Sequence, residues 1–173
     1  MRTPMLETDR LILRPLTMDD AEAVFAWTGD PAVNEFMNYT THADVAFTRE
    51  WLSRMDNDSG SAYNFGFVRK EDGRLIGSGG VFYHPDTGEW HFGYNVRRDA
   101  WGRGYATEAM KRIIAFAHQE LNAKDFISEH ALENEASGRV IEKCGLRFSH
   151  YGSYEKADGS RVFQSKCYAM HLE

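Results

Sequence analysis

The stretch from Glu89 to Ala117 constrains the fold most, because it predicts a strand, a glycine turn and a helix in direct succession. Aromatic and branched residues over 89–96 favour an extended strand. Apolar residues recur at helical spacing over 106–117 and predict an amphipathic helix. A further strand predicted over 124–132 completes a strand–helix–strand unit, which requires one parallel strand pair in the sheet.

Gly102 and Gly104 stand where the predicted helix begins. The first N–H groups of a helix have no partners within the helix, and glycines let a ligand approach them closely. The helix dipole adds partial positive charge at the same place. Such a turn suits a phosphate or diphosphate, although a tight turn without any ligand is the other interpretation of this motif alone.

Two familiar phosphate-binding loops do not match this turn. A Walker loop needs Gly-Lys-Ser/Thr, but Tyr105 and Ala106 follow Gly104. A dinucleotide-binding fingerprint needs another glycine where Thr107 stands. The form that remains is Trp101-x-x-Gly104-x-Ala106.

The rest of the chain predicts strands and helices in an order typical of an α+β fold. With 173 residues and 42% hydrophobic content, the chain suits a single domain, residues 1–173, with a sizeable core. The expected sheet is mixed, mostly antiparallel and flanked by helices. Strands are expected at 9–15, 62–69, 74–83, 89–96, 124–132, 147–156 and 161–172. Helices are expected after Thr17 or Asp19, at 31–36, after Thr41, from about 105 to 117, and at 133–143.

Composition excludes several classes of function. The net charge of −6 argues against a general nucleic-acid binder. We find no signal core, no apolar run of membrane length, and no ligand spacing among the seven histidines and two cysteines that would indicate a metal site. Cys144 and Cys167 are typical of free thiols in a reducing compartment. We therefore expect a cytoplasmic protein, monomeric or homodimeric, with no nucleic-acid, membrane or metal partner.

Three segments together resemble the GNAT acyltransferases. Trp101-x-x-Gly104-x-Ala106 is similar to their Arg/Gln-x-x-Gly-x-Gly/Ala loop and departs from it at Trp101. Residues 134–146 resemble the Asn-x-x-Ser-x-x-x-x-x-Lys-x-Gly-Phe element that follows the fifth strand of that family. Residues 10–16 and 102–109 resemble the branch that contains ribosomal-protein N-terminal acetyltransferases. The resemblance spans nearly the whole chain, with its pieces in the right order.

This resemblance implies a GNAT fold with a splayed parallel strand pair, acetyl-CoA as co-substrate and an amine as acceptor. The implied contacts of the pantetheine arm are the backbone groups of Asn95, Val96 and Arg97. The implied diphosphate contacts are the N–H groups of Trp101, Gly102, Arg103, Gly104, Tyr105, Ala106 and Thr107. Asn134 would meet the cofactor through its side-chain amide, or cap the following helix, or do both.

The implied chemistry is direct attack of a deprotonated amine on the thioester, in a ternary complex, which a general base assists. Glu89 and His91 lie two residues apart on one strand and therefore share a face. The related branch often has glutamate where His91 stands. Histidine titrates near neutral pH, so His91 is a candidate base through a water relay. A packed histidine and a solvated strand-end carboxylate are the alternative interpretations of these two residues.

Many GNAT enzymes protonate the leaving thiolate with a tyrosine on the last helix, but the matching position here is Ile141. Ser137 is the nearest substitute, and we expect it to hydrogen-bond the departing sulfur. A catalytically weak acyl-CoA sensor or scaffold of the same fold stays open, as does a different nucleotide-binding enzyme. The acceptor also stays open among protein N-termini, polyamines, aminoglycosides and free amino compounds. Its expected pocket residues are Trp27, Phe36, Tyr39, Trp51, Tyr154 and Phe163.

Overall fold

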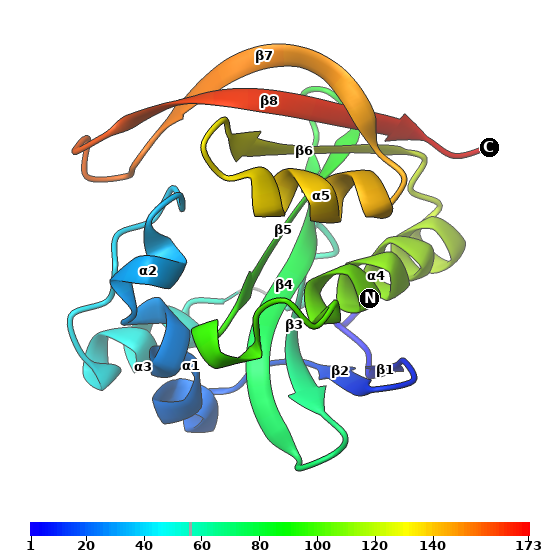
Figure 1. The fold of residues 1–173 in the computed structure, drawn as a ribbon. Coiled ribbons are helices and arrows are strands. Elements are labelled where there is room, and N and C mark those ends of the chain that lie inside the picture. Colours follow the sequence, from blue (N-terminus) through cyan, green and yellow to red (C-terminus); the bar gives the residue numbers. More distant parts are fainter. Residues whose placement is uncertain (56) are drawn as a thin grey trace.

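Eight strands form one sheet in the computed structural model, which describes residues 1–55 and 57–173 (Figure 1). The strand order is β1-β2-β3-β4-β5-β6-β8-β7. Every neighbouring pair is antiparallel except β5 and β6, which are parallel. The predicted mixed, mostly antiparallel sheet is therefore confirmed. The strands are β1 (Leu6–Glu7), β2 (Leu11–Arg14), β3 (Ala62–Arg69), β4 (Arg74–His84), β5 (Glu89–Val96), β6 (Asp125–Ala131), β7 (Arg147–Glu155) and β8 (Val162–His171).

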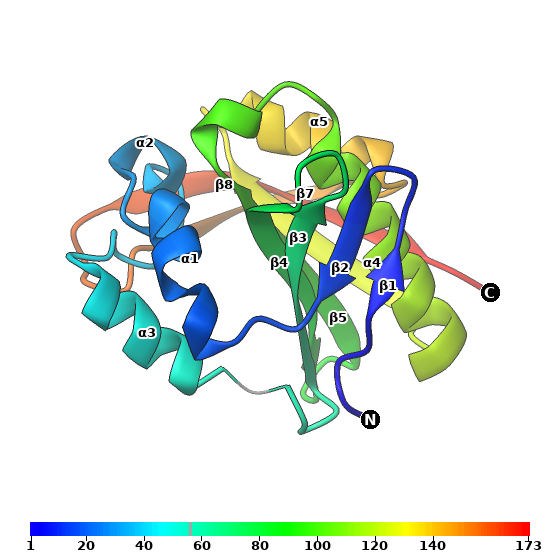
Figure 2. The same cartoon turned by 90° about the horizontal axis from the view of Figure 1, so that it is seen from below.

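Helices cover both faces of the sheet (Figure 2). One group packs on one face and consists of α1 (Ala21–Thr28), α2 (Pro31–Asn34) and α3 (Val45–Ser53). The opposite face carries α4 (Tyr105–Leu121) and α5 (Glu135–Lys143). The chain also contains two short 3-10 helices, η1 (Met18–Asp20) and η2 (Arg98–Ala100). The larger core lies between the sheet and α4, and a smaller one lies under α1 and α3. Among the described residues, no helix has both the length and the apolar character that a membrane span requires.

The parallel strands β5 and β6 pair only briefly. Their register holds at Trp90 with Phe126 and at His91 with Ile127. Beyond these pairs the strands separate, and the buried Ser128 hydroxyl donates a 3.0 Å hydrogen bond to the Phe92 carbonyl. The splay implied by the family resemblance is thus confirmed.

The glycines of β4 let that strand lie close against both neighbours. A Cβ at Gly77 would collide with the Asn95 carbonyl of β5, and one at Gly80 with the Tyr63 carbonyl of β3. A β-bulge interrupts the β3–β4 register between Phe67 and Val68, opposite this part of β4.

The N-terminal region differs from the sequence prediction in four details. The two-residue strand β1 was not predicted, because two residues carry no periodicity. The helix expected after Thr41 begins only at Val45, because the Asp44 carboxylate caps it by accepting a 2.8 Å hydrogen bond from the Phe47 N–H. Thr17, after which a helix is expected, is the N-cap of η1, and α1 follows η1 directly. The helix α2 ends at Asn34, two residues before its expected end.

The N-terminal strands are tied to the start of α4 by one carboxylate. Glu108 accepts hydrogen bonds from the Thr8 hydroxyl at 2.6 Å, the Arg10 guanidinium at 2.8 Å and the Arg10 backbone N–H at 3.1 Å. The same guanidinium donates to the Arg103 carbonyl at 2.9 Å and lies over the Tyr105 ring. Burial alone would raise the pKa of Glu108, but these donors lower it below its usual value.

The Glu108→Gln variant tests this tie. We expect its free energy of unfolding at pH 7 to fall by about 1–2 kcal/mol, because charge-assisted hydrogen bonds are lost. Because folding lowers the pKa of Glu108, its ionised carboxylate stabilises the folded protein at pH values above the ordinary pKa of 4.5. The difference in unfolding free energy between the unchanged protein and the variant should therefore narrow as pH falls through the folded-state pKa of Glu108. Urea unfolding measures both effects. The control is Glu120→Gln, at an exposed position of α4. Equal unfolding free energies of the two variants would contradict a stabilising role of the hydrogen bonds to Glu108.

Candidate functional site

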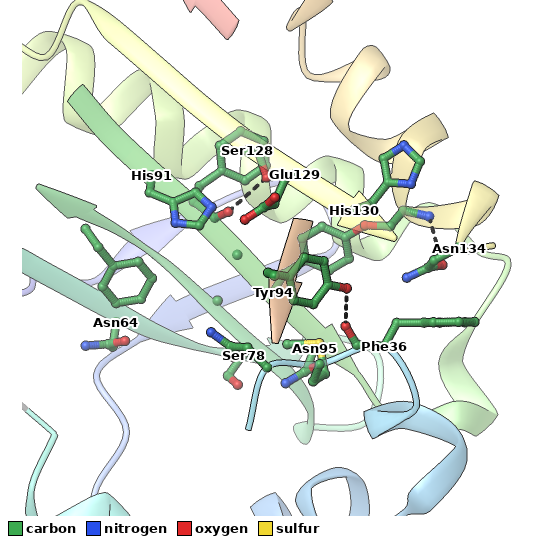
Figure 3. Close-up of a pocket in the computed structure, with 18 of the residues that line it drawn as sticks. Phe36, Asn64, Ser78, His91, Tyr94, Asn95, Ser128, Glu129, His130 and Asn134 are labelled. Atoms are coloured by element: carbon green, nitrogen blue, oxygen red, sulfur yellow. Dashed lines mark hydrogen bonds between the residues drawn. The ribbon is translucent and has the colours of Figure 1, made fainter. Parts of the chain in front are cut away.

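A cavity of about 380 Å³ opens where β5 and β6 separate (Figure 3). Its walls include residues 91–95 of β5, residues 128–130 of β6 and residues 36–38 after α2. Further side chains come from α3, β4 and the start of α5. The cavity therefore joins the two faces of the sheet through the gap between the splayed strands.

Side chains of β5 alternate between the two faces. Trp90, Phe92 and Val96 are buried in the core under α4, so His91 and Asn95 lie on the α1–α3 face. The Asn95 amide donates to the Tyr39 hydroxyl at 2.6 Å, and that hydroxyl donates to the buried Asn34 amide oxygen at 2.5 Å. The side chain of Asn95 is thus engaged within the protein.

His91 is suited to accept a proton. Its burial lowers the pKa of the imidazole below 6.5, Glu129 on β6 opposes that shift, and His84 adds to it. A neutral ring at pH 7 has a free lone pair. Figure 3 shows His91 and Glu129 at the same end of the cavity. Glu129 itself accepts a 2.9 Å hydrogen bond from the Ser165 hydroxyl.

On the opposite face, Tyr94 and Ser137 form a hydroxyl pair. The Tyr94 hydroxyl donates to the Ser137 oxygen at 3.1 Å, and burial raises the pKa of Tyr94 to about 12, which keeps it protonated. The Ser137 N–H donates to the Asn134 amide oxygen at 3.3 Å, so the predicted helix-cap role of Asn134 is confirmed. Ile141, one turn further on, is buried in the core.

The glycine turn presents an open helix start. Gly102 and Gly104 have φ values of +74° and +79°, which side chains other than glycine rarely adopt. The first helical bond runs from the Glu108 N–H to the Gly104 carbonyl. In the part of the chain that the structure describes, no acceptor meets the N–H groups of Tyr105, Ala106 and Thr107. These donors fit a diphosphate.

Trp101 ties this turn to the end of β5. Its indole N–H donates to the Val96 carbonyl at 2.7 Å. The Arg97 N–H bonds to the Ile76 carbonyl within the sheet, and the Arg97 side chain pairs with Asp99. Of the three residues expected along the pantetheine arm, Val96 and Arg97 therefore already use one backbone group each inside the protein.

Comparison with known proteins decides the family. The protein-family model described as "Acetyltransferase (GNAT) domain" matches residues 10–147 of this chain. The chain belongs to the GNAT acetyltransferase family. It is 31% identical over 163 residues to "Uncharacterized N-acetyltransferase p20" of Bacillus licheniformis, covering 91% of this chain and 90% of the relative.

Solved GNAT structures share the fold. The ribosomal-protein-S5-alanine acetyltransferase from Vibrio fischeri has a TM-score of 0.80 and 15% identity, covering 97% of this chain and 96% of that one. The microcin C7 self-immunity acetyltransferase MccE, solved with acetyl-CoA and AMP, has a TM-score of 0.83 and 16% identity, covering 95% and 94%. At these identities the likeness shows a shared fold.

In this GNAT chain, the structure brings some predicted site residues together and leaves others apart. His91, Asn95, Asn134 and Ser137 line the cavity. Glu89 is the first residue of β5, paired with His84, and does not line it. Among the expected acceptor-pocket residues, the lining includes Phe36, Trp51 and Tyr154, whereas Trp27 and Phe163 are buried in the protein and Tyr39 bonds to Asn95.

Sequence reasoning missed Glu129 and the role of Tyr94. The paired residues His91 and Ile127 share a face, and alternation along β6 then places Glu129 on that face too. The sequence predicts both strands but not their register, which this assignment requires. Tyr94 lies three residues after His91 on β5, but its partner Ser137 is 43 residues away in the sequence.

We expect the His91 imidazole in the folded protein to titrate below its ordinary value of 6.5. Glu129→Gln should lower this pKa further, because it removes a carboxylate that favours the imidazolium. NMR titration of labelled histidine rings measures both values, with Glu120→Gln as the control. A His91 pKa above 6.5 would contradict the effect of burial on this ring. A pKa that rises in Glu129→Gln would contradict the effect assigned to the Glu129 carboxylate.

Proposed function

We propose that this protein transfers the acetyl group of acetyl-CoA to a primary amine by direct attack in a ternary complex. The observation that carries the proposal is the cavity through the splayed strands, which joins the Ser137 side of the sheet to His91. The family assignment supports the reaction class, and the open start of α4 supports the donor.

The open helix start of α4 would hold the diphosphate through the N–H groups from Tyr105 to Thr107. The pantetheine arm would enter between β5 and β6, and Asn134 would add its amide N–H₂, because its amide oxygen caps α5. When bound, acetyl-CoA supplies the activated thioester. Among the described residues, the N–H groups of Tyr105 to Thr107 and the Asn134 amide N–H₂ have no acceptor within the protein.

The amine nitrogen must lose a proton before or as it attacks. Its lone pair forms the new N–C bond, the C–S bond breaks, and the sulfur leaves with the bonding electrons. Neutral His91 would take the amine proton, directly or through one water. Ser137 would donate a hydrogen bond to the departing sulfur, because the Tyr94 hydroxyl already occupies one lone pair of its oxygen.

Gly104→Ala tests the diphosphate seat. The added Cβ is strained at this positive φ and stands beside the open N–H groups, so we expect the dissociation constant of acetyl-CoA to rise about tenfold. Gly88→Ala, in a turn with φ +76°, is the matched control with similar strain. Isothermal titration calorimetry measures the affinity. Equal affinity in both variants would contradict a seat at Gly104.

Ser137→Ala tests the hydrogen bond to sulfur. We expect turnover to fall about ten- to a hundredfold with little change in acetyl-CoA affinity, because a hydroxyl is a weak acid but a good donor. Tyr94→Phe should cause a smaller loss, since it leaves the Ser137 hydroxyl in place. Thiol release under saturating amine measures turnover. Complete loss of transfer in Ser137→Ala, with affinity intact, would mean that Ser137 does more than donate a hydrogen bond.

The function as a whole is tested in two steps. Acetyl-CoA, but not NAD or ATP, should raise the melting temperature, because a ligand that binds only the folded state stabilises it. Thiol release is then followed with a panel of primary amines. Stabilisation without release from any amine would point to an acyl-CoA sensor or scaffold instead of an enzyme.

A further inference from the structure

The part of the cavity on the α1–α3 face of the sheet, where His91 lies, would receive the acceptor and is largely apolar. Beside His91, its walls include aromatic and thioether side chains from the segment after α2, from α3 and its C-terminal flank, and from β4, namely Phe36, Met37, Trp51, Met55 and Phe82. Polar side chains, including Asn64, Ser78 and Asn95, also line the cavity, but more of the lining is apolar. Such a surface favours a ligand with an apolar body.

The charges that line the cavity have one sign. Among the described lining residues, Glu129 is the single carboxylate, and neither Lys nor Arg is present. The Glu129 carboxylate favours a cation in a poorly solvated space. A substrate carboxylate or phosphate would face Glu129 with no Lys or Arg among the described lining residues to balance it.

Hydrogen bonds from residues 154–156 to residues 34–37, here called the strap, close one side of the cavity. The Tyr154 hydroxyl, at the end of β7, donates to the Phe36 carbonyl at 2.6 Å. The Lys156 ammonium donates to the carbonyls of Asn34 and Met37 at 2.8 Å each. These bonds join the tip of the β7–β8 hairpin to the segment after α2 (Figure 1). They also engage Lys156, a cation next to the cavity wall, with backbone oxygens.

We propose that the acceptor is a small primary amine with an aromatic or otherwise apolar body and no carboxylate or phosphate group. This inference rests on the proposed acetyl transfer and names the substrate class of the same site. Glu129 would attract the ammonium, His91 would take its proton, and the apolar walls would hold the body. A polyamine or an aminoglycoside would place further ammonium groups against apolar walls. A free amino acid would bring its carboxylate toward Glu129.

The experiment compares four acceptors under identical conditions: phenethylamine, phenylalanine, spermidine and a hexapeptide with an N-terminal alanine. The first two differ only in the carboxylate. We expect kcat/KM for phenethylamine to exceed that for phenylalanine about a hundredfold, because one uncompensated charge repulsion separates them. It should also exceed the values for spermidine and the peptide.

Glu129→Gln gives the second readout. We expect kcat/KM for phenethylamine to fall about tenfold and that for phenylalanine to hold or rise, so their ratio shrinks. Glu120→Gln, on the exposed face of α4, should leave the ratio unchanged. A melting-temperature shift with acetyl-CoA checks that each variant is folded and binds the donor.

The outcomes distinguish failure of the acceptor class from failure of acetyl transfer. A preference for phenylalanine, spermidine or the peptide, or a ratio that Glu129→Gln leaves unchanged, would overturn the acceptor class and leave acetyl transfer intact. Binding of acetyl-CoA without thiol release from any of the four amines would overturn this inference. The same result with the whole panel of primary amines would overturn the proposed transfer.

Discussion

The brief pairing of β5 with β6 is the constraint on which the rest of the site depends. Two residue pairs hold the parallel strands together, and the Ser128 hydroxyl then bonds to the Phe92 carbonyl where the backbones part. A fully paired strand couple would seal the sheet. Because the strands separate instead, one cavity reaches His91 and Glu129 on one face and Tyr94 and Ser137 on the other.

The start of α4 is held by residues far from it in sequence. Arg10 bonds to both Glu108 and the Arg103 carbonyl, so the N-terminal strands fix the turn that precedes the helix. Trp101 fixes the other side of the turn through the Val96 carbonyl. This bond gives a physical role to the residue at which the chain departs from the usual GNAT loop pattern.

Local patterns predicted the elements well, and long-range geometry limited the prediction of the site. Residues 62–69 alternate clearly and form a strand with those bounds, and Asn134 caps α5 as an asparagine before a helix should. Glu129 could not be assigned without the register between two strands that lie far apart in sequence. The Tyr94–Ser137 bond also depends on how α5 packs beside β5, which no local pattern specifies.

The strap between the β7–β8 hairpin and the segment after α2 has a consequence for how this enzyme can diversify. It is built from the Tyr154 and Lys156 side chains and the Ala157 N–H, which meet backbone carbonyls, including that of Asn38. None of these groups belongs to the helix start proposed to hold the donor. Substitutions in the tip of the β7–β8 hairpin therefore change acceptor specificity without altering the residues proposed to bind acetyl-CoA.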